Sequence, residues 1–179
     1  GLVRFSITEI NDPPLAIDDI LASISEGTGE RIIRFEELLQ NDLPGPANEV
    51  RQTLTIVAVT NAIGGAVQIA GSNVIFTPTP NFEGAAGFVY FVRDDGTSGG
   101  IGDPKTAQAN VRFHIAGVNN RPVGVPQSVS MNENTSILIT LTGDDSDPNV
   151  VQSLTFAITG LPLHGTISQF DSKTGQLRY

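Results

Sequence analysis

Carboxylate side chains gather in one short segment of this 179-residue chain, Gly143–Asn149 (GDDSDPN). Asp144, Asp145 and Asp147 stand there within four positions of one another. Like charges this close repel unless water or a cation separates them. Ca²⁺ takes about six to eight oxygen ligands from carboxylates, amides and backbone carbonyls, whereas zinc prefers His or Cys. The segment therefore predicts a calcium site.

Other carboxylate and amide side chains stand beside the ends of apolar runs, where linkers and turns are expected. They are Asn11, Asp12, Glu26, Asp42, Asp94, Asp95, Asn119, Asn120 and Glu133. Each is a candidate metal ligand. Each is also compatible with simple turn chemistry, because Asn and Asp side chains bind local backbone N–H groups. The turn interpretation is strongest at Asp94 and Asp95, which precede a glycine.

Enzymatic chemistry has no support in the sequence. His114 and His164 lie fifty residues apart without an acid or nucleophile in a recognisable motif, and no phosphate-binding loop is present. A net charge of -9 argues against nucleic acid as a partner. The absence of cysteine excludes disulfides and thiolate metal sites. No apolar stretch is long enough to insert into a bilayer.

An internal repeat organises the chain. VRFSITEIND at residues 3–12 returns as VRFHIAGVNN at residues 111–120, an offset of 108 residues without a gap. Weaker matches keep the same order: Ser25–Thr28 with Asn132–Thr135, Leu54–Ile56 with Leu154–Phe156, and Val74–Phe76 with Leu177–Tyr179. We therefore expect the last strand of a preceding repeat at 1–10, a complete repeat at 11–118, and the first strands of a second repeat at 119–179.

The complete repeat has seven short apolar runs between Gly, Pro, Asn and Asp clusters, which predicts an all-β, Greek-key β-sandwich. The predicted strands are Ile20–Ser25, Arg31–Phe35, Thr53–Thr60, Ala66–Ile69, Asn73–Thr77, Gly87–Arg93 and Thr106–Gly117. Period-two alternation turns Phe88, Tyr90 and Val92 to one side of their strand, and leaves Arg112 and His114 facing outward on the next.

Four local features complete the expected fold. Residues 35–40 (FEELLQ) predict a helix of about one and a half turns. Gly99–Asp103 is typical of a flexible hairpin loop. Tyr90 could form a hydrogen-bonded corner, but we expect a core ring with its hydroxyl at the rim. Phe91 and Val89 face outward, either half-covered on a central strand or forming a contact surface.

Several segments together resemble the cadherin-like repeats of large bacterial surface and secreted proteins. They are the linker Asn11–Pro14 (NDPP), the stretch 81–96 (NFEGAAGFVYFVRDDG) and the stretch 162–169 (PLHGTISQ). The resemblance spans the whole chain, and its order and spacing carry more weight than any single motif. It implies tandem cadherin-like, immunoglobulin-like sandwiches.

The resemblance also implies where calcium binds, because in that family the ion lies between consecutive domains. Carried over, the junction inside this chain would use Glu26, Asp94 or Asp95, Asn119, Asn120, Asp145 and Asp147. Arg121 departs from the family pattern by bringing a positive charge to the linker. At the upstream junction Asp42 is kept, but Pro44 replaces a second acid, and Glu49 could supply the missing carboxylate. We expect the two junctions to bind calcium unequally.

The function implied is structural and adhesive, in an extracellular, secreted or cell-surface protein such as a bacterial adhesin. The expected partners are neighbouring repeats of the same chain, and a cell-surface protein or glycan. One alternative is a ligand- or glycan-binding module, which the lack of tryptophan disfavours. Another is an accessory domain beside a catalytic region outside this chain.

Overall fold

The chain forms two compact units. The computed structural model describes residues 1–147 and 152–179, and these divide into Gly1–Gly117 (unit 1) and Val118–Tyr179 (unit 2). The predicted division lies between residues 118 and 119. Pro148 and Asn149, which end the predicted acidic loop, lie outside the described residues.

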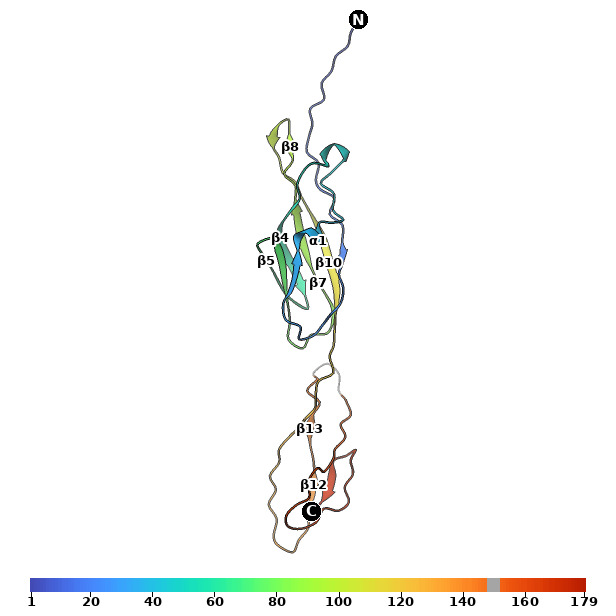
Figure 1. Ribbon diagram of the computed structural model, residues 1–179, viewed down its shortest axis with the longest axis vertical. Helices are drawn as coiled ribbons and strands as arrows, with labels where there is room; N and C mark the ends of the chain where they lie inside the picture. The colour runs from blue at the N-terminus through green and yellow to red at the C-terminus, as the bar shows by residue number, and fades with distance from the viewer. Residues whose placement is uncertain (148–151) are drawn as a thin grey trace. The chain divides into compact units, whose positions relative to one another are not determined.

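Unit 1 is a two-layer sandwich of short strands (Figure 1). Its strands are β1 (Asp19–Ile20), β2 (Ile24–Ser25), β3 (Arg31–Arg34), β4 (Thr55–Ile63), β5 (Gly65–Ala70), β6 (Asn73–Pro78), β7 (Gly84–Arg93), β8 (Thr97–Ser98), β9 (Ile101–Gly102) and β10 (Thr106–Ala116). One sheet has the order β1-β10-β7-β4, with β2 also paired to β10, and the other has the order β3-β6-β5. The predicted all-β, Greek-key fold is confirmed.

The first predicted strand is divided in two. β1 and β2 both pair with β10 in parallel, with Asp19 opposite Val111 and Ile24 opposite Ile115. Between them the Leu21 N–H donates to the Arg112 carbonyl at 2.9 Å, so the chain stays against β10. Residues 1–10 contain no strand, and their apolar side chains are largely exposed.

The core lies between the two sheets. On β7 and β10 the residues that period-two alternation predicts to face inward are buried, which confirms the predicted alternation. Phe76 of β6 packs edge-on against Phe113 with ring centroids 5.0 Å apart, and stacks on Phe88 at 6.3 Å. Because Phe76 has no exposed surface, it joins the strands of one layer to those of the other.

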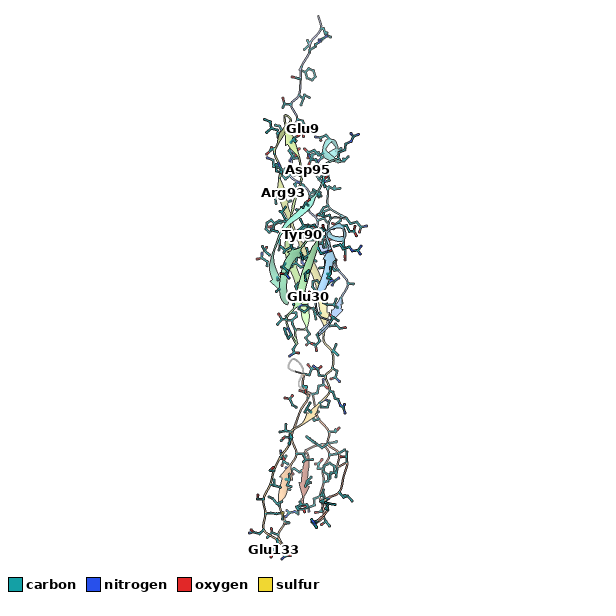
Figure 2. All side chains as sticks on the ribbon, turned by 60° about the vertical axis from the view of Figure 1, so that its left-hand side comes forward. Glu9, Glu30, Tyr90, Arg93, Asp95 and Glu133 are labelled. Atoms are coloured by element: carbon teal, nitrogen blue, oxygen red, sulfur yellow. The ribbon has the colours of Figure 1, made fainter. Side chains whose placement is uncertain are left out.

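The Tyr90 hydroxyl lies inside the core, so its prediction as a rim group is wrong. It is fully buried and donates to Asp42 Oδ2 at 2.9 Å, with the Leu38 carbonyl oxygen at 3.3 Å. Figure 2 shows Tyr90 within the body of unit 1. A buried phenol needs a partner, and Asp42 supplies it. Phe91 and Val89 are half-buried on β7, which has β4 on one side and β10 on the other.

Short helical turns and a hairpin connect the strands. The predicted helix is confirmed as α1 (Phe35–Leu38), and a 3-10 turn, η1 (Ala47–Glu49), precedes β4. Gly99 and Gly100 of the predicted hairpin loop join β8 to β9, with Ser98 opposite Ile101, whereas Ile101 and Gly102 of that loop form β9 itself. In the described part of the chain, no helix has the length and hydropathy needed to cross a membrane.

Unit 2 repeats the strand pairings with which unit 1 begins. Its strands are β11 (Val123–Gly124), β12 (Leu138–Thr140), β13 (Gly143–Asp144) and β14 (Gln176–Arg178). The pairing of Val123 with Asp144 reproduces the bridge between Leu15 and Leu43. The pairing of β12 with β14 likewise corresponds to that of β3 with β6.

Replacing Phe76 tests the sandwich core. Phe76→Ala removes the ring that spans the two sheets and leaves a cavity, so we expect a loss of about 3–5 kcal/mol in unfolding free energy. Ile32→Ala on the neighbouring strand β3 is the control, because Ile32 is 65% exposed, and we expect less than about 1 kcal/mol. Denaturant unfolding of both variants measures the difference, and equal losses would contradict the proposed core.

Candidate functional site

The linker residue Asn11 is buried at one end of unit 1, with 2% of its surface exposed. Its side-chain NH₂ donates to Asp94 Oδ1 and to the Asp103 carbonyl, both at 2.9 Å. Its side-chain oxygen accepts from Gln52 Nε2 at 2.6 Å, and its backbone N–H donates to Ser98 Oγ at 2.9 Å. Four hydrogen bonds therefore fix the linker to the unit that follows it.

Asp94 organises the loop between β7 and β10. Besides the bond from Asn11, its Oδ1 accepts the backbone N–H groups of Gly96 at 3.0 Å and Lys105 at 2.9 Å. A Cβ on Gly96 would lie 1.8 Å from the Asn11 side-chain oxygen, so glycine is required by the close approach. The structure places Asp94 against Asn11, whereas the sequence grouped it with Asn119. Strand β7 ends beside the upstream linker.

Asp95 lies at the same end of unit 1. It is exposed, and its Oδ1 accepts the Thr53 N–H at 2.7 Å. Figure 2 shows Asp95 on the side of unit 1 that carries Glu9, away from Glu30. Asp95 therefore joins the group around the upstream linker.

Glu49, which the sequence offered as a replacement carboxylate, reaches this linker from η1. It is buried, with 2% of its surface exposed, and its Oε1 accepts the backbone N–H of Asp12 at 3.0 Å. The Asp12 side chain itself is exposed. Glu49 Oε2 lies against the backbone of Gly45, where a Cβ would approach it to 2.0 Å.

Three buried oxygens around the linker have no hydrogen-bond donor. They are Glu49 Oε2, Gln52 Oε1 and Asp94 Oδ2. Each belongs to a side chain that already bonds Asn11 or Asp12 through its other polar atom. A buried oxygen without a donor is costly, and a bound cation would satisfy it. The residues present fit a cation with oxygen ligands.

Carboxylates alone cannot form a metal site around the linker. Within residues 1–147 and 152–179, no three His, Cys, Asp or Glu side chains are close enough together to hold a metal ion. Amide and backbone oxygens must therefore supply part of any ligand set, which suits calcium and disfavours zinc.

Asp42 is not brought to the linker. Its Oδ1 accepts the Ile17 N–H at 2.7 Å and its Oδ2 accepts the Tyr90 hydroxyl, so both oxygens are used inside the sandwich. The pairings of Leu15 with Leu43 and Val123 with Asp144 explain the difference. They align Asp42 with Gly143, one position before the first aspartate of the acidic segment in unit 2.

Two glutamates, Glu26 and Glu83, lie near the other end of β10. The Glu26 N–H donates to the Ala116 carbonyl at 2.8 Å, which carries Glu26 to the end of β10. The Glu83 carboxylate lies against Gly117, where a Cβ would approach Oε2 to 2.1 Å. No sequence signal selected Glu83, although it is the acidic residue of the NFEG segment that carries part of the resemblance. Only its folded position distinguishes it.

Unit 2 forms its own cluster of carboxylate and amide groups at its first residues. Gln152 Nε2 donates to Asn119 Oδ1, and lies 3.3 Å from Asp147 Oδ2. The Gln152 N–H donates to Asp145 Oδ2 at 2.6 Å, and this bond, with that from the Asp147 N–H, lowers the pKa of Asp145. Asp145 is therefore held in its ionised form.

The remaining residues of this cluster form hydrogen bonds with the acidic segment itself. The Asn120 side chain donates to the Ser146 carbonyl at 2.9 Å, and the Ser146 N–H donates to Asp144 Oδ1 at 2.8 Å. Arg121 is exposed. The structure thus brings together the linker amides and the acidic segment that the sequence separated by more than twenty residues.

The same Asn–Gln bond occurs in both units. Gln52 and Gln152 occupy equivalent positions, two residues before the aligned leucines of their strands. Each donates its side-chain amide to the linker asparagine that precedes its own strands. The repeated bond is a structural feature of the repeat itself.

Glu133 stands apart from these groups. It is exposed in a turn where Thr135 Oγ1 donates to the Asn132 carbonyl at 2.6 Å, as Thr28 does to Ser25 in unit 1. Within unit 2 it lies at the end far from β13 (Figures 1 and 2).

The sandwich topology defines an immunoglobulin-like β-sandwich repeat. Residues 10–112 match the family model described as "Cadherin-like domain", and the chain therefore belongs to the cadherin-like domain family. Residues 103–178 match a second model, "SibA-like, immunoglobulin-like domain".

A solved structure supports the fold. The crystal structure of Drosophila N-cadherin EC1-4 is similar with a TM-score of 0.50 and 14% sequence identity. The match covers 92% of this chain and 39% of that chain, so this chain spans well under half of the N-cadherin molecule. A search of curated proteins found no match.

Removing the Asn11 side chain tests its role in fixing the linker. Asn11→Ala leaves the Gln52 amide without its acceptor and removes one of the three donors to Asp94 Oδ1, so we expect a loss of about 2–3 kcal/mol in unfolding free energy of unit 1. Asn48→Ala is the control, because Asn48 is exposed in η1, and we expect a change below about 0.5 kcal/mol. Denaturant unfolding measures both, and unchanged stability in both variants would show that the buried bonds are dispensable.

The Gly96 position tests the close approach directly. Gly96→Ala forces a methyl group against the Asn11 amide, and we expect a loss of about 1–3 kcal/mol with greater hydrogen exchange at the linker. Gly102→Ala is the matched control, because no atom lies within 4 Å of the point that its Cβ would occupy. We expect it to leave the unfolding free energy nearly unchanged. A harmless Gly96→Ala would mean that the linker packs differently.

Proposed function

We propose that this chain is a non-enzymatic, structural and adhesive repeat of an extracellular protein, whose linkers bind calcium. The observation that carries the proposal is the set of donor-free buried oxygens on Glu49, Gln52 and Asp94. Water-exposed turn residues would not need a cation, but buried oxygens without a hydrogen-bond donor are costly unless a cation binds them.

At the upstream linker, the ligands would be Glu49, Asp94 and Gln52, with Asp12 and Asp95 exposed beside them. Bound calcium would neutralise the Glu49 and Asp94 carboxylates, coordinate the Gln52 amide oxygen and tie the linker to the loops around it. Asn11 contributes by position, because its side chain is already used in holding Gln52 and Asp94.

At the start of unit 2, the ligands would be Asp145 and Asp147, with Asn119, Asn120 and Asp144 completing the polar group. Their oxygens are more exposed than those of Glu49 and Asp94, so water would fill more of the coordination shell. The two sites differ in burial and in ligand type, which supports unequal calcium affinity. Glu26 and Glu83 at the end of β10 are further candidates.

The role that follows is mechanical. A linker whose charges are neutralised by calcium loses hinge freedom, and an array of such repeats holds adhesive modules away from a surface. The partners we propose are neighbouring repeats and a cell-surface protein or glycan, in a secreted or cell-surface protein such as a bacterial adhesin. Family membership supports this role.

Calcium titration of chelator-treated protein tests the proposal. We expect calcium to raise the melting temperature and to bind with measurable heat. Asp145→Asn and Glu49→Gln each remove one carboxylate from a different site, so each should weaken binding at its site by about tenfold. Asp171→Asn and Glu36→Gln are matched controls, since Asp171 caps a turn and Glu36 lies exposed on α1.

Two results would contradict it. The first is a melting temperature and scattering profile that calcium and chelator leave unchanged. The second is equal loss of calcium affinity in the control and site variants. Binding of a glycan by the calcium-free protein would favour a ligand-binding module instead.

A further inference from the structure

Two buried aspartates that belong to neither linker group lie around Tyr90 in the core of unit 1. Asp19 of β1 is 9% exposed and Asp42, after α1, is 7% exposed. The fully buried Tyr90 interacts electrostatically with each of them. Such a pair of like charges is unfavourable away from water unless donors or a proton compensate.

Donors are distributed unequally between the two carboxylates. Both Asp42 oxygens have one, Oδ1 from the Ile17 N–H at 2.7 Å and Oδ2 from the Tyr90 hydroxyl at 2.9 Å. Asp19 Oδ1 accepts from Asn41 Nδ2 at 3.1 Å, but the buried Oδ2 has no donor. Tyr90 has a single hydroxyl hydrogen, so it cannot satisfy both aspartates at once.

We propose that Asp19 is a proton-binding site that fastens β1 to the sandwich: the folded unit 1 holds one proton on Asp19 while Asp42 stays ionised. The proton comes from water and converts Asp19 from an acceptor-only group into a donor. The reaction involves no other bond change. It reduces two buried charges to one.

The surroundings of Asp19 favour this proton. Burial raises the pKa of Asp19 to about 6; the Asp42 and Asp18 charges act in the same direction, whereas the nearby Tyr90 hydroxyl and the Asn41 hydrogen bond oppose it. Asp18 is exposed, with its Oδ2 3.4 Å from Arg112. Burial also raises the pKa of Asp42, but its two donors oppose that shift.

The three segments that meet at this site explain why the proton matters. Asn41 reaches back to the Ile17 and Asp18 carbonyls at 3.3 and 3.4 Å, as well as to Asp19. The site therefore joins the start of β1 to the loop after α1 and to the centre of β7. Ionisation of Asp19 places a second negative charge at this joint and weakens it.

The raised pKa of Asp19 determines how the stability of unit 1 changes with pH. A folded carboxyl with a pKa of about 6 binds protons more tightly than the unfolded one, whose value is 3.8. Unit 1 is therefore stabilised by protonation, and this stabilisation is lost progressively as pH rises from about 4 through the folded pKa of about 6. The pKa of Asp18 is lowered, so the effect of its own titration on stability falls at a lower pH than that of Asp19.

A carboxyl NMR titration of the whole chain in chelator tests the proton site directly. We expect one aspartate signal, assigned to Asp19, to titrate near pH 6, and the Asp18 signal to titrate below its ordinary range. If every unit 1 aspartate titrates below about pH 5, the proposal is overturned.

Thermal unfolding in chelator supplies the second test. For the wild type, we expect the melting temperature to fall by about 5 °C between about pH 5 and pH 7. Asp19→Asn mimics the neutral group, so the fall should disappear and the melting temperature near pH 7 should exceed that of the wild type. Asp18→Asn is the matched control and should keep the wild-type fall.

A wild-type melting temperature independent of pH, or an Asp19→Asn variant that keeps the fall, would refute the site. If Asp19→Asn does not fold, the wild-type carboxyl titration still decides. The chelator removes calcium, so success or failure here is separate from that of the linker sites.

Discussion

The buried side chain of Asn11 is the interaction on which the organisation of this repeat depends. An amide has two donors and an acceptor, and here they join the segment before β4, the loop after β7 and the linker at one point. A carboxylate could not donate to Asp94, and an apolar side chain would leave the Gln52 amide unpaired and Asp94 with only its two backbone donors. The linker is therefore an integral part of the unit it precedes.

This constraint recurs in unit 2, but its surroundings differ. Asn119 and Gln152 keep the same amide contact, while the carboxylates beside them come from one loop of the sequence. In unit 1, the corresponding carboxylates are Glu49 and Asp94, from separate loops and almost completely buried. A common backbone arrangement can therefore hold two polar groups of different charge, burial and expected cation affinity.

Buried polar side chains form two separate groups in unit 1, one around Asn11 and one around Tyr90. Around Asn11 the donor-free oxygens lie beside the linker, with the exposed acids Asp12 and Asp95 nearby. Around Tyr90 the carboxylates lie in the core, where a proton is the compensation that needs the least space. Strand β7 connects these places, so the proposed cation site at the end of unit 1 and the proposed proton site in its core share one strand.

The sequence by itself determined the all-β fold, the repeat and the approximate positions of the longer strands of unit 1, because period-two alternation and turn residues are local signals. It also selected Glu49 and the acidic segment of unit 2. It did not determine that Asp94 meets Asn11, that Asp42 turns to Tyr90, or that Glu83 lies against Gly117. Those contacts join residues dozens of positions apart, and only the pairing of the strands decides which loops share an end and which carboxylates lose access to water.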